Sequence, residues 1–105
     1  MKHHIPHGLP HALARAATRE ALESYRARFA SYAPEGDWID EDHARVSFRA
    51  LGQRVEGAVV VGPDDVELEL EVPLLLRPFR ERALEVIEHE VRVWIERARA
   101  GQLSA

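Results

Sequence analysis

The feature that most constrains the fold of this chain is the run DVELELEV at residues 65–72. It places an apolar side chain at every even position and a carboxylate at every odd position. Successive side chains of a β-strand point to opposite faces of a sheet, so this segment has one apolar face and one charged face. The chain must therefore form a sheet that packs a core on one side and faces water on the other.

Three further segments predict strands beside this one. Residues 44–49 alternate in the same way, and residues 55–61 carry valine or glycine at every second position. Residues 38–39 suit a short strand before them. Turn chemistry at residues 51–53 and 62–65 separates the strands, and such short connections favour an antiparallel meander.

Two amphipathic helices are expected on either side of the strands. Apolar residues recur every three or four positions over residues 10–33, and a second helix is expected at about residues 78–100. Pro10 and Pro78 suit the first turn of each helix, where a missing N–H loses no partner. We predict an α+β fold in the order helix, antiparallel three- to four-stranded meander, helix, with both helices on one face of the sheet. The predicted core positions of the sheet are Val46, Phe48, Val59, Val61, Val66, Leu68 and Leu70.

Length and composition point to one domain. The chain has 105 residues, 46% hydrophobic and 30% charged, which suits a single globular core. We expect residues 1–105 to form one α+β domain, with residues 1–8 as a flexible N-terminal segment. No signal peptide and no run of roughly 18 apolar residues is present, so we expect a cytoplasmic protein without a membrane span.

Charge argues against nucleic acid as a partner. The formal net charge is −4, and the middle of the chain is strongly acidic. Binding to a phosphate backbone needs a basic face, and the only candidates are a few arginines of the first helix, Arg15, Arg19 and Arg26.

The groups that suggest catalytic or metal chemistry are each better explained without a functional site. His3, His4, His7 and His11 lie close in sequence but lack coligands at a recognised metal spacing, so we expect them to serve neither a metal nor the fold. His89 lies on the polar arc of its helix, and the carboxylates of residues 65–71 are too far apart for one cation. Enzyme motifs and cysteines are absent. We therefore expect no catalytic residues, no metal and no cofactor.

The last helix carries more apolar surface than one sheet can cover. Its apolar residues span an arc of roughly 200°, against the ~100° stripe that packing on one surface requires. The remainder is covered by the first helix, by a second copy of the protein, or by an apolar partner surface.

Several motifs resemble the polyhydroxyalkanoic acid system family, also called polyhydroxyalkanoate granule-region proteins. They are the HGLP segment at 7–10, Val46 and Phe48, the VEG segment at 55–57, the apolar positions of residues 66–70, and the LLRPFR segment at 75–80. The resemblance implies a bacterial cytoplasmic protein associated with storage of polyhydroxyalkanoate, an intracellular polyester packed as hydrophobic granules. It implies no established enzymatic activity and no defined functional residues.

Three hypotheses follow. The first is a non-enzymatic accessory protein that binds a hydrophobic granule or lipid surface through Leu74, Leu75, Leu76, Phe79 and the exposed flank of the last helix. The second is a homodimer or partner-protein module that buries the same residues. The third is a small-ligand pocket or enzyme site between the helices and the sheet, which would appear as a deep cavity with converging polar groups.

Overall fold

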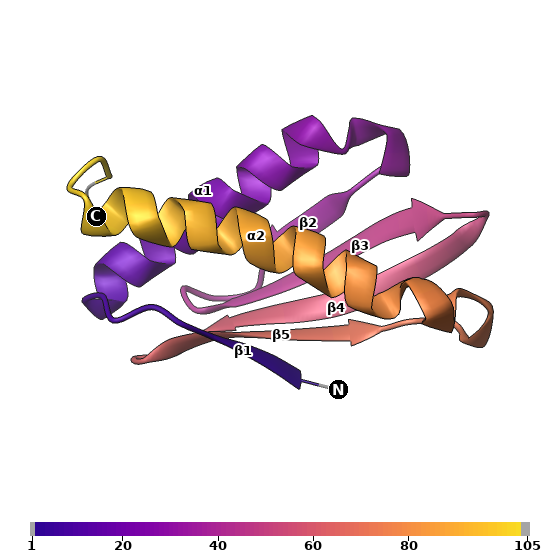
Figure 1. Cartoon of the computed structure of the whole chain (residues 1–105), viewed down its shortest axis with the longest axis horizontal. Helices are drawn as coiled ribbons and strands as arrows, with labels where there is room; N and C mark the ends of the chain where they lie inside the picture. Colours follow the sequence, from indigo (N-terminus) through magenta and orange to yellow (C-terminus); the bar gives the residue numbers. More distant parts are fainter. Residues whose placement is uncertain (1, 104–105) are drawn as a thin grey trace.

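The computed structural model describes residues 2–103 and has two layers, a sheet and a pair of helices (Figure 1). The elements follow in the order β1 (Lys2–Pro6), α1 (His11–Arg28), the 3₁₀ helix η1 (Ala30–Tyr32), β2 (Glu35–Trp38), β3 (His43–Ala50), β4 (Gln53–Val61), β5 (Asp65–Glu71), the 3₁₀ helix η2 (Leu74–Phe79) and α2 (Arg80–Arg99). The α+β class is confirmed. So is the antiparallel arrangement of the strands that lie between the two helices in the sequence.

The sheet has five strands rather than three or four, in the order β1-β5-β4-β3-β2, and every neighbouring pair is antiparallel. The register brings the apolar positions of neighbouring strands opposite one another, since Leu68 pairs with Val59 and Val59 with Ala44. Val66, Leu68 and Leu70 are buried, as the alternation predicts. The carboxylates of β5 lie on the opposite, uncovered face.

The first strand differs from the expected flexible segment. Residues 2–6 pair with residues 65–69 of β5, and Ile5, opposite Val66, is fully buried. The alternation of buried and exposed positions is not visible in this part of the sequence. His3 and His4 point to opposite faces of the strand, but both are histidines, so the sequence shows no apolar–polar contrast between them. The segment thus belongs to the sheet as an edge strand.

Both helices lie on the same face of the sheet and pack against each other (Figure 1). The first helix ends at Arg28 rather than near residue 33, and η1 continues the chain from Ala30 to Tyr32. The second helix begins at Arg80, because residues 74–79 adopt the tighter 3₁₀ geometry that includes Pro78. Within residues 2–103, no helix is both long enough and apolar enough to cross a membrane.

The wide apolar arc of α2 is covered mostly within the chain. Val91 and Ile95 are buried in the common core with Ala17 and Ala21 of α1, while Trp94 is only half-buried. All the apolar side chains of α2 are buried or half-buried. The exposed flank proposed for this helix is therefore absent, and the exposed apolar residues lie just before it, in η2.

Candidate apolar contact site

The residues expected to form an apolar contact surface lie in and at the end of η2, and they differ in exposure. Leu74, Leu75 and Phe79 are 76%, 71% and 56% exposed, whereas Leu76 is 2% exposed. Leu76 is thus part of the protein interior and not of the surface. The other three present large apolar side chains to solvent at the entrance to α2.

Two further exposed residues from distant parts of the chain lie at the same end of the molecule. Leu51, in the β3–β4 turn, is 74% exposed, and Tyr32, in η1, is 47% exposed. Figure 1 shows the C-terminal end of α1, the β3–β4 turn and the segment that leads into α2 at one end of the molecule, on the right in that view. We name Tyr32, Leu51, Leu74, Leu75 and Phe79 the apolar end.

An open groove of about 440 Å³ lies at the apolar end. Its lining is almost entirely apolar and includes both exposed and half-buried rings. Two arginines at the start of α2, Arg80 and Arg82, are the charged residues along it. The apolar lining residues are Phe29, Tyr32, Phe48, Ala50, Leu51, Val55, Val72, Leu76, Phe79, Ala83 and Val86.

Aromatic rings lead from the first helix to this groove. The ring centroids of Tyr25 and Phe29 are 4.8 Å apart, and those of Phe29 and Tyr32 are 6.4 Å apart. The spacing of these three rings suits one face of the helix expected over residues 10–33. The α-helix instead ends at Arg28, and Tyr32 reaches the surface beside the groove.

Leu51 was missed because its segment was interpreted only as a turn. The loop between β3 and β4 has two residues, Leu51 and Gly52, with φ values of 51° and 74°. Positive φ at both positions is the pattern of a type I′ hairpin turn, where asparagine or aspartate followed by glycine is preferred. A leucine before glycine in a two-residue hairpin is the signal that could have identified this residue.

The space between α1 and the sheet is small. Its cavity measures about 50 Å³, far below the roughly 300–1,000 Å³ of small-molecule sites. The lining is mainly apolar, with Tyr25, Trp38 and Val46 among its members. The deep cavity with converging polar groups expected of a ligand pocket is therefore not found at this position.

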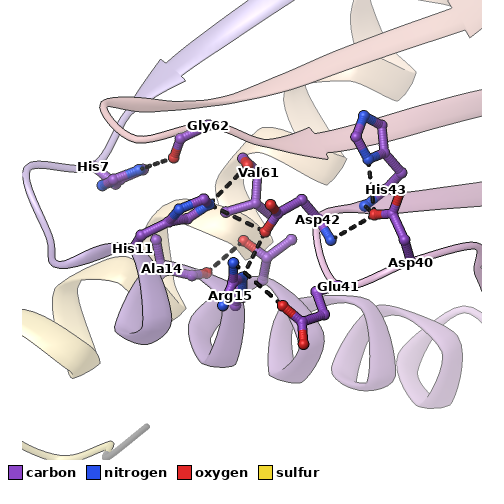
Figure 2. Close-up of polar contacts among 11 residues, drawn as sticks. His7, His11, Ala14, Arg15, Asp40, Glu41, Asp42, His43, Val61 and Gly62 are labelled. Atoms are coloured by element: carbon purple, nitrogen blue, oxygen red, sulfur yellow. Dashed lines mark hydrogen bonds and ion pairs between the residues drawn. The ribbon is translucent and has the colours of Figure 1, made fainter.

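A polar cluster lies at the start of α1 (Figure 2). Asp42 Oδ1 accepts a hydrogen bond from Arg15 Nε at 2.6 Å and lies 3.1 Å from His11 Nε2, which is also 3.1 Å from the carbonyl oxygen of Val61. The hydrogen bond from Arg15 is the main cause that lowers the pKa of Asp42. The cluster joins α1 to the residues before β3 and to the end of β4.

A second carboxylate closes the hairpin between β2 and β3. Asp40 Oδ1 accepts hydrogen bonds from the backbone N–H groups of Asp42 and His43, at 2.8 and 2.9 Å, and lies 2.8 Å from His43 Nδ1 (Figure 2). These bonds lower the pKa of Asp40, the one from Asp42 N–H most. The groups of both clusters thus bond to one another and to the backbone, and the groove at the apolar end is lined by other residues.

The four N-terminal histidines have separate partners. His3 contacts Glu88 of α2, His4 Nδ1 lies 2.9 Å from Asp65 on the uncovered face, and His7 is fully buried. Among residues 2–103, no three His, Cys, Asp or Glu side chains lie close enough together to hold a metal ion. His89 is exposed on α2.

The fold and its surface define a small α+β protein in which two helices cover one face of a five-stranded antiparallel sheet and one end exposes apolar side chains. The sequence matches a protein-family model described as "Putative polyhydroxyalkanoic acid system protein" over residues 2–95. The chain therefore belongs to the polyhydroxyalkanoic acid system family. No match was found among curated proteins.

Proposed function

We propose that this protein is a non-enzymatic accessory component of the polyhydroxyalkanoate system that binds the hydrophobic surface of polyester granules through the apolar end. Membership of the family supports the link to the polyester. Leu74, Leu75 and Phe79, together with the groove, supply the contact.

The observation that carries this proposal is the gathering of exposed apolar side chains at one end. Single exposed leucines are ordinary on protein surfaces, but a contiguous apolar patch marks an interaction site. Here Tyr32 of η1, Leu51 of the β3–β4 turn and Phe79 of η2 line one groove, and Leu74 and Leu75 are exposed in the same 3₁₀ helix as Phe79. Each large side chain removed from water at a contact contributes up to about 1.5–3 kcal/mol, so several together can hold the protein on a surface.

The backbone conformation of Leu51, which is unfavourable for leucine, supports the same interpretation. The left-handed backbone conformation costs most residues other than glycine roughly 1–2 kcal/mol, and asparagine adopts this conformation more readily than leucine. Leu51 has a φ of 51° and its side chain is exposed, so it gains little from burial in the isolated protein. A contact surface outside the chain would explain a leucine at this position.

Cosedimentation with polyhydroxybutyrate particles stripped of protein and lipid tests the proposal. The wild-type protein should bind the particles, and Leu75→Ser combined with Phe79→Ser should weaken binding at least about tenfold while the fold is retained. Ile39→Ser is the matched control, since Ile39 is also 60% exposed but lies in the loop between β2 and β3, outside the apolar end. This control variant should bind as the wild type does.

Two results would contradict the proposal. The first is a wild-type protein that stays in the supernatant with every particle preparation. The second is a wild-type dimer in light scattering that the Leu75 and Phe79 substitutions convert to a folded monomer. In that case the apolar end is the interface of a homodimer, the alternative that the sequence left open.

A further inference from the structure

Three arginines flank the apolar end without acidic partners. Arg77 lies in η2, and Arg80 and Arg82 line the groove. Within the described part of the chain, none of the three forms an ion pair, and the same holds for Arg19, Arg45, Arg49 and Arg97, whereas six other arginines are paired. The paired arginines are Arg15, Arg26, Arg28, Arg54, Arg92 and Arg99.

The location of these arginines is unfavourable for the helix itself. The N-terminal end of a helix carries a partial positive charge, so acidic residues stabilise the first turn and basic residues destabilise it. Glu81 is the only acidic residue in the first turn of α2, and it lies between Arg80 and Arg82. Helix stability therefore does not explain Arg80 and Arg82 at this place, whereas Arg77 lies in the last turn of η2.

The three arginines outnumber the two carboxylates beside them, Glu71 and Glu81, which line one surface hollow with Arg77 and Arg80. The protein as a whole has the opposite balance. The formal net charge of the chain is −4, and the carboxylates of β5 occupy the uncovered face of the sheet. An anionic surface would repel that face and attract the end that carries the arginines. The same end exposes Leu74, Leu75 and Phe79. Apolar side chains bordered by basic ones are typical of segments that lie at a lipid interface.

We propose that the apolar end binds a layer of anionic phospholipid, with Leu74, Leu75 and Phe79 in the acyl region and Arg77, Arg80 and Arg82 on the phosphate groups. The guanidinium group forms two parallel hydrogen bonds with a phosphate, which favours arginine for this contact. This inference rests on the proposed function, because it uses the same apolar residues and adds the chemistry of the surface they meet.

Vesicle flotation tests the inference. Vesicles of phosphatidylcholine alone are compared with vesicles that also contain phosphatidylglycerol, at low and physiological salt. The wild-type protein should bind the anionic vesicles more tightly, and added salt should weaken this binding. Arg77→Gln, Arg80→Gln and Arg82→Gln together should weaken this binding roughly 10- to 100-fold. Each basic residue near an anionic surface strengthens binding by up to about fivefold.

A triple variant of equal charge is the control. Arg45→Gln, Arg92→Gln and Arg97→Gln remove three exposed arginines from β3 and from the middle and last turns of α2. This variant has the same net charge as the first but should keep most of the vesicle binding. Equal loss in both variants would mean that total charge alone governs binding, and would overturn the inference.

The outcomes separate this inference from the proposed function. Equal wild-type binding to neutral and anionic vesicles, or unchanged binding of the Arg77, Arg80 and Arg82 variant, overturns the inference while binding to bare polyester particles still supports the proposed function. Tight binding to anionic vesicles with no binding to bare polyester supports the lipid contact and contradicts the polyester contact. The first triple variant should lose far more binding to anionic vesicles than to bare polyester, because that polymer is neutral along its chain.

Discussion

The imidazole of His7 donates a hydrogen bond from Nε2 to the carbonyl oxygen of Gly62, 2.9 Å away, and so joins the segment after β1 to the turn between β4 and β5 (Figure 2). The backbone N–H of Leu9 donates to Nδ1 of the same ring, also at 2.9 Å. This second bond fixes the neutral tautomer with its proton on Nε2. His7 is fully buried, so both ring nitrogens are satisfied in the interior.

His7→Ala should lower the free energy of unfolding by about 2–4 kcal/mol, because it leaves a cavity and two buried backbone groups without partners. This corrects the expectation that the four N-terminal histidines are dispensable for the fold. His4→Ala, at an exposed position of β1, should change stability by less than about 0.5 kcal/mol. Urea denaturation measures both. A His7→Ala protein as stable as the wild type would contradict the role assigned to this ring.

Gly57 of β4 has no space for a side chain. A Cβ atom there would lie 2.5 Å from the carbonyl oxygen of Glu69 and 2.6 Å from Cδ2 of Leu70. Gly57→Ala should therefore cost about 1–3 kcal/mol, since the strand must shift away from the carbonyl oxygen of Glu69 and Leu70 must also change rotamer. At Gly36 a Cβ atom would meet its nearest neighbour at 3.4 Å. Gly36→Ala is the matched control and should leave the urea midpoint nearly unchanged.

Acid should weaken two carboxylate contacts, that of Asp42 with α1 and that of Asp40 within the β2–β3 hairpin. The hydrogen bond from Arg15 lowers the pKa of Asp42, and the backbone N–H of Asp42 lowers that of Asp40, each below the ordinary value of 3.8. Because these folded-state pKa values are depressed, the stability they confer is present above pH 3.8 and is lost as the pH falls through the folded-state values. The urea midpoint should therefore decrease below about pH 4.

Asp42→Asn isolates the contribution of one of these carboxylates. The variant should be less stable than the wild type at neutral pH, and the difference should shrink as the wild-type carboxylate becomes protonated. Asp37→Asn, at an exposed position of β2, controls for the loss of one negative charge. The difference in stability between Asp42→Asn and the wild type could instead stay the same from pH 7 to pH 2. This result would show that the depressed pKa of Asp42 contributes nothing to stability.

The periodicity of apolar residues was sufficient to predict both helices and the strands β3 to β5. The alternation of β5 and the three- and four-residue spacing of the helices reflect burial of one side, which any single strand or helix must show. The strand β1 lacked such a signal, because only Ile5 is both apolar and buried there and its pairing with β5 joins residues far apart in sequence. Local pattern cannot specify a contact of that kind.

The candidate site was predicted only in part for a similar reason. The apolar segment at residues 74–79 is evident in the sequence, but the sequence cannot distinguish buried Leu76 from exposed Leu75. Nor can it bring Tyr32 and Leu51 to the same end, since their proximity depends on where α1 stops and how β3 and β4 pair. The sequence also left open what covers the wide apolar arc of α2, and of the three alternatives it is α1 that packs against it.

Leu51 allows stability and surface binding to be separated in one position. Asn-Gly is preferred in a type I′ turn, so Leu51→Asn should raise the free energy of unfolding by about 0.5–1 kcal/mol as the strain at a φ of 51° is reduced. The same change removes an apolar side chain that is 74% exposed at the apolar end, and binding to polyester particles should weaken several-fold. Leu51→Ala is the control, because it removes the side chain but does not supply asparagine's tolerance of this conformation. It should weaken binding to a similar extent without the gain in stability. A more stable Leu51→Asn protein that binds particles as tightly as the wild type would show that Leu51 lies outside the contact surface.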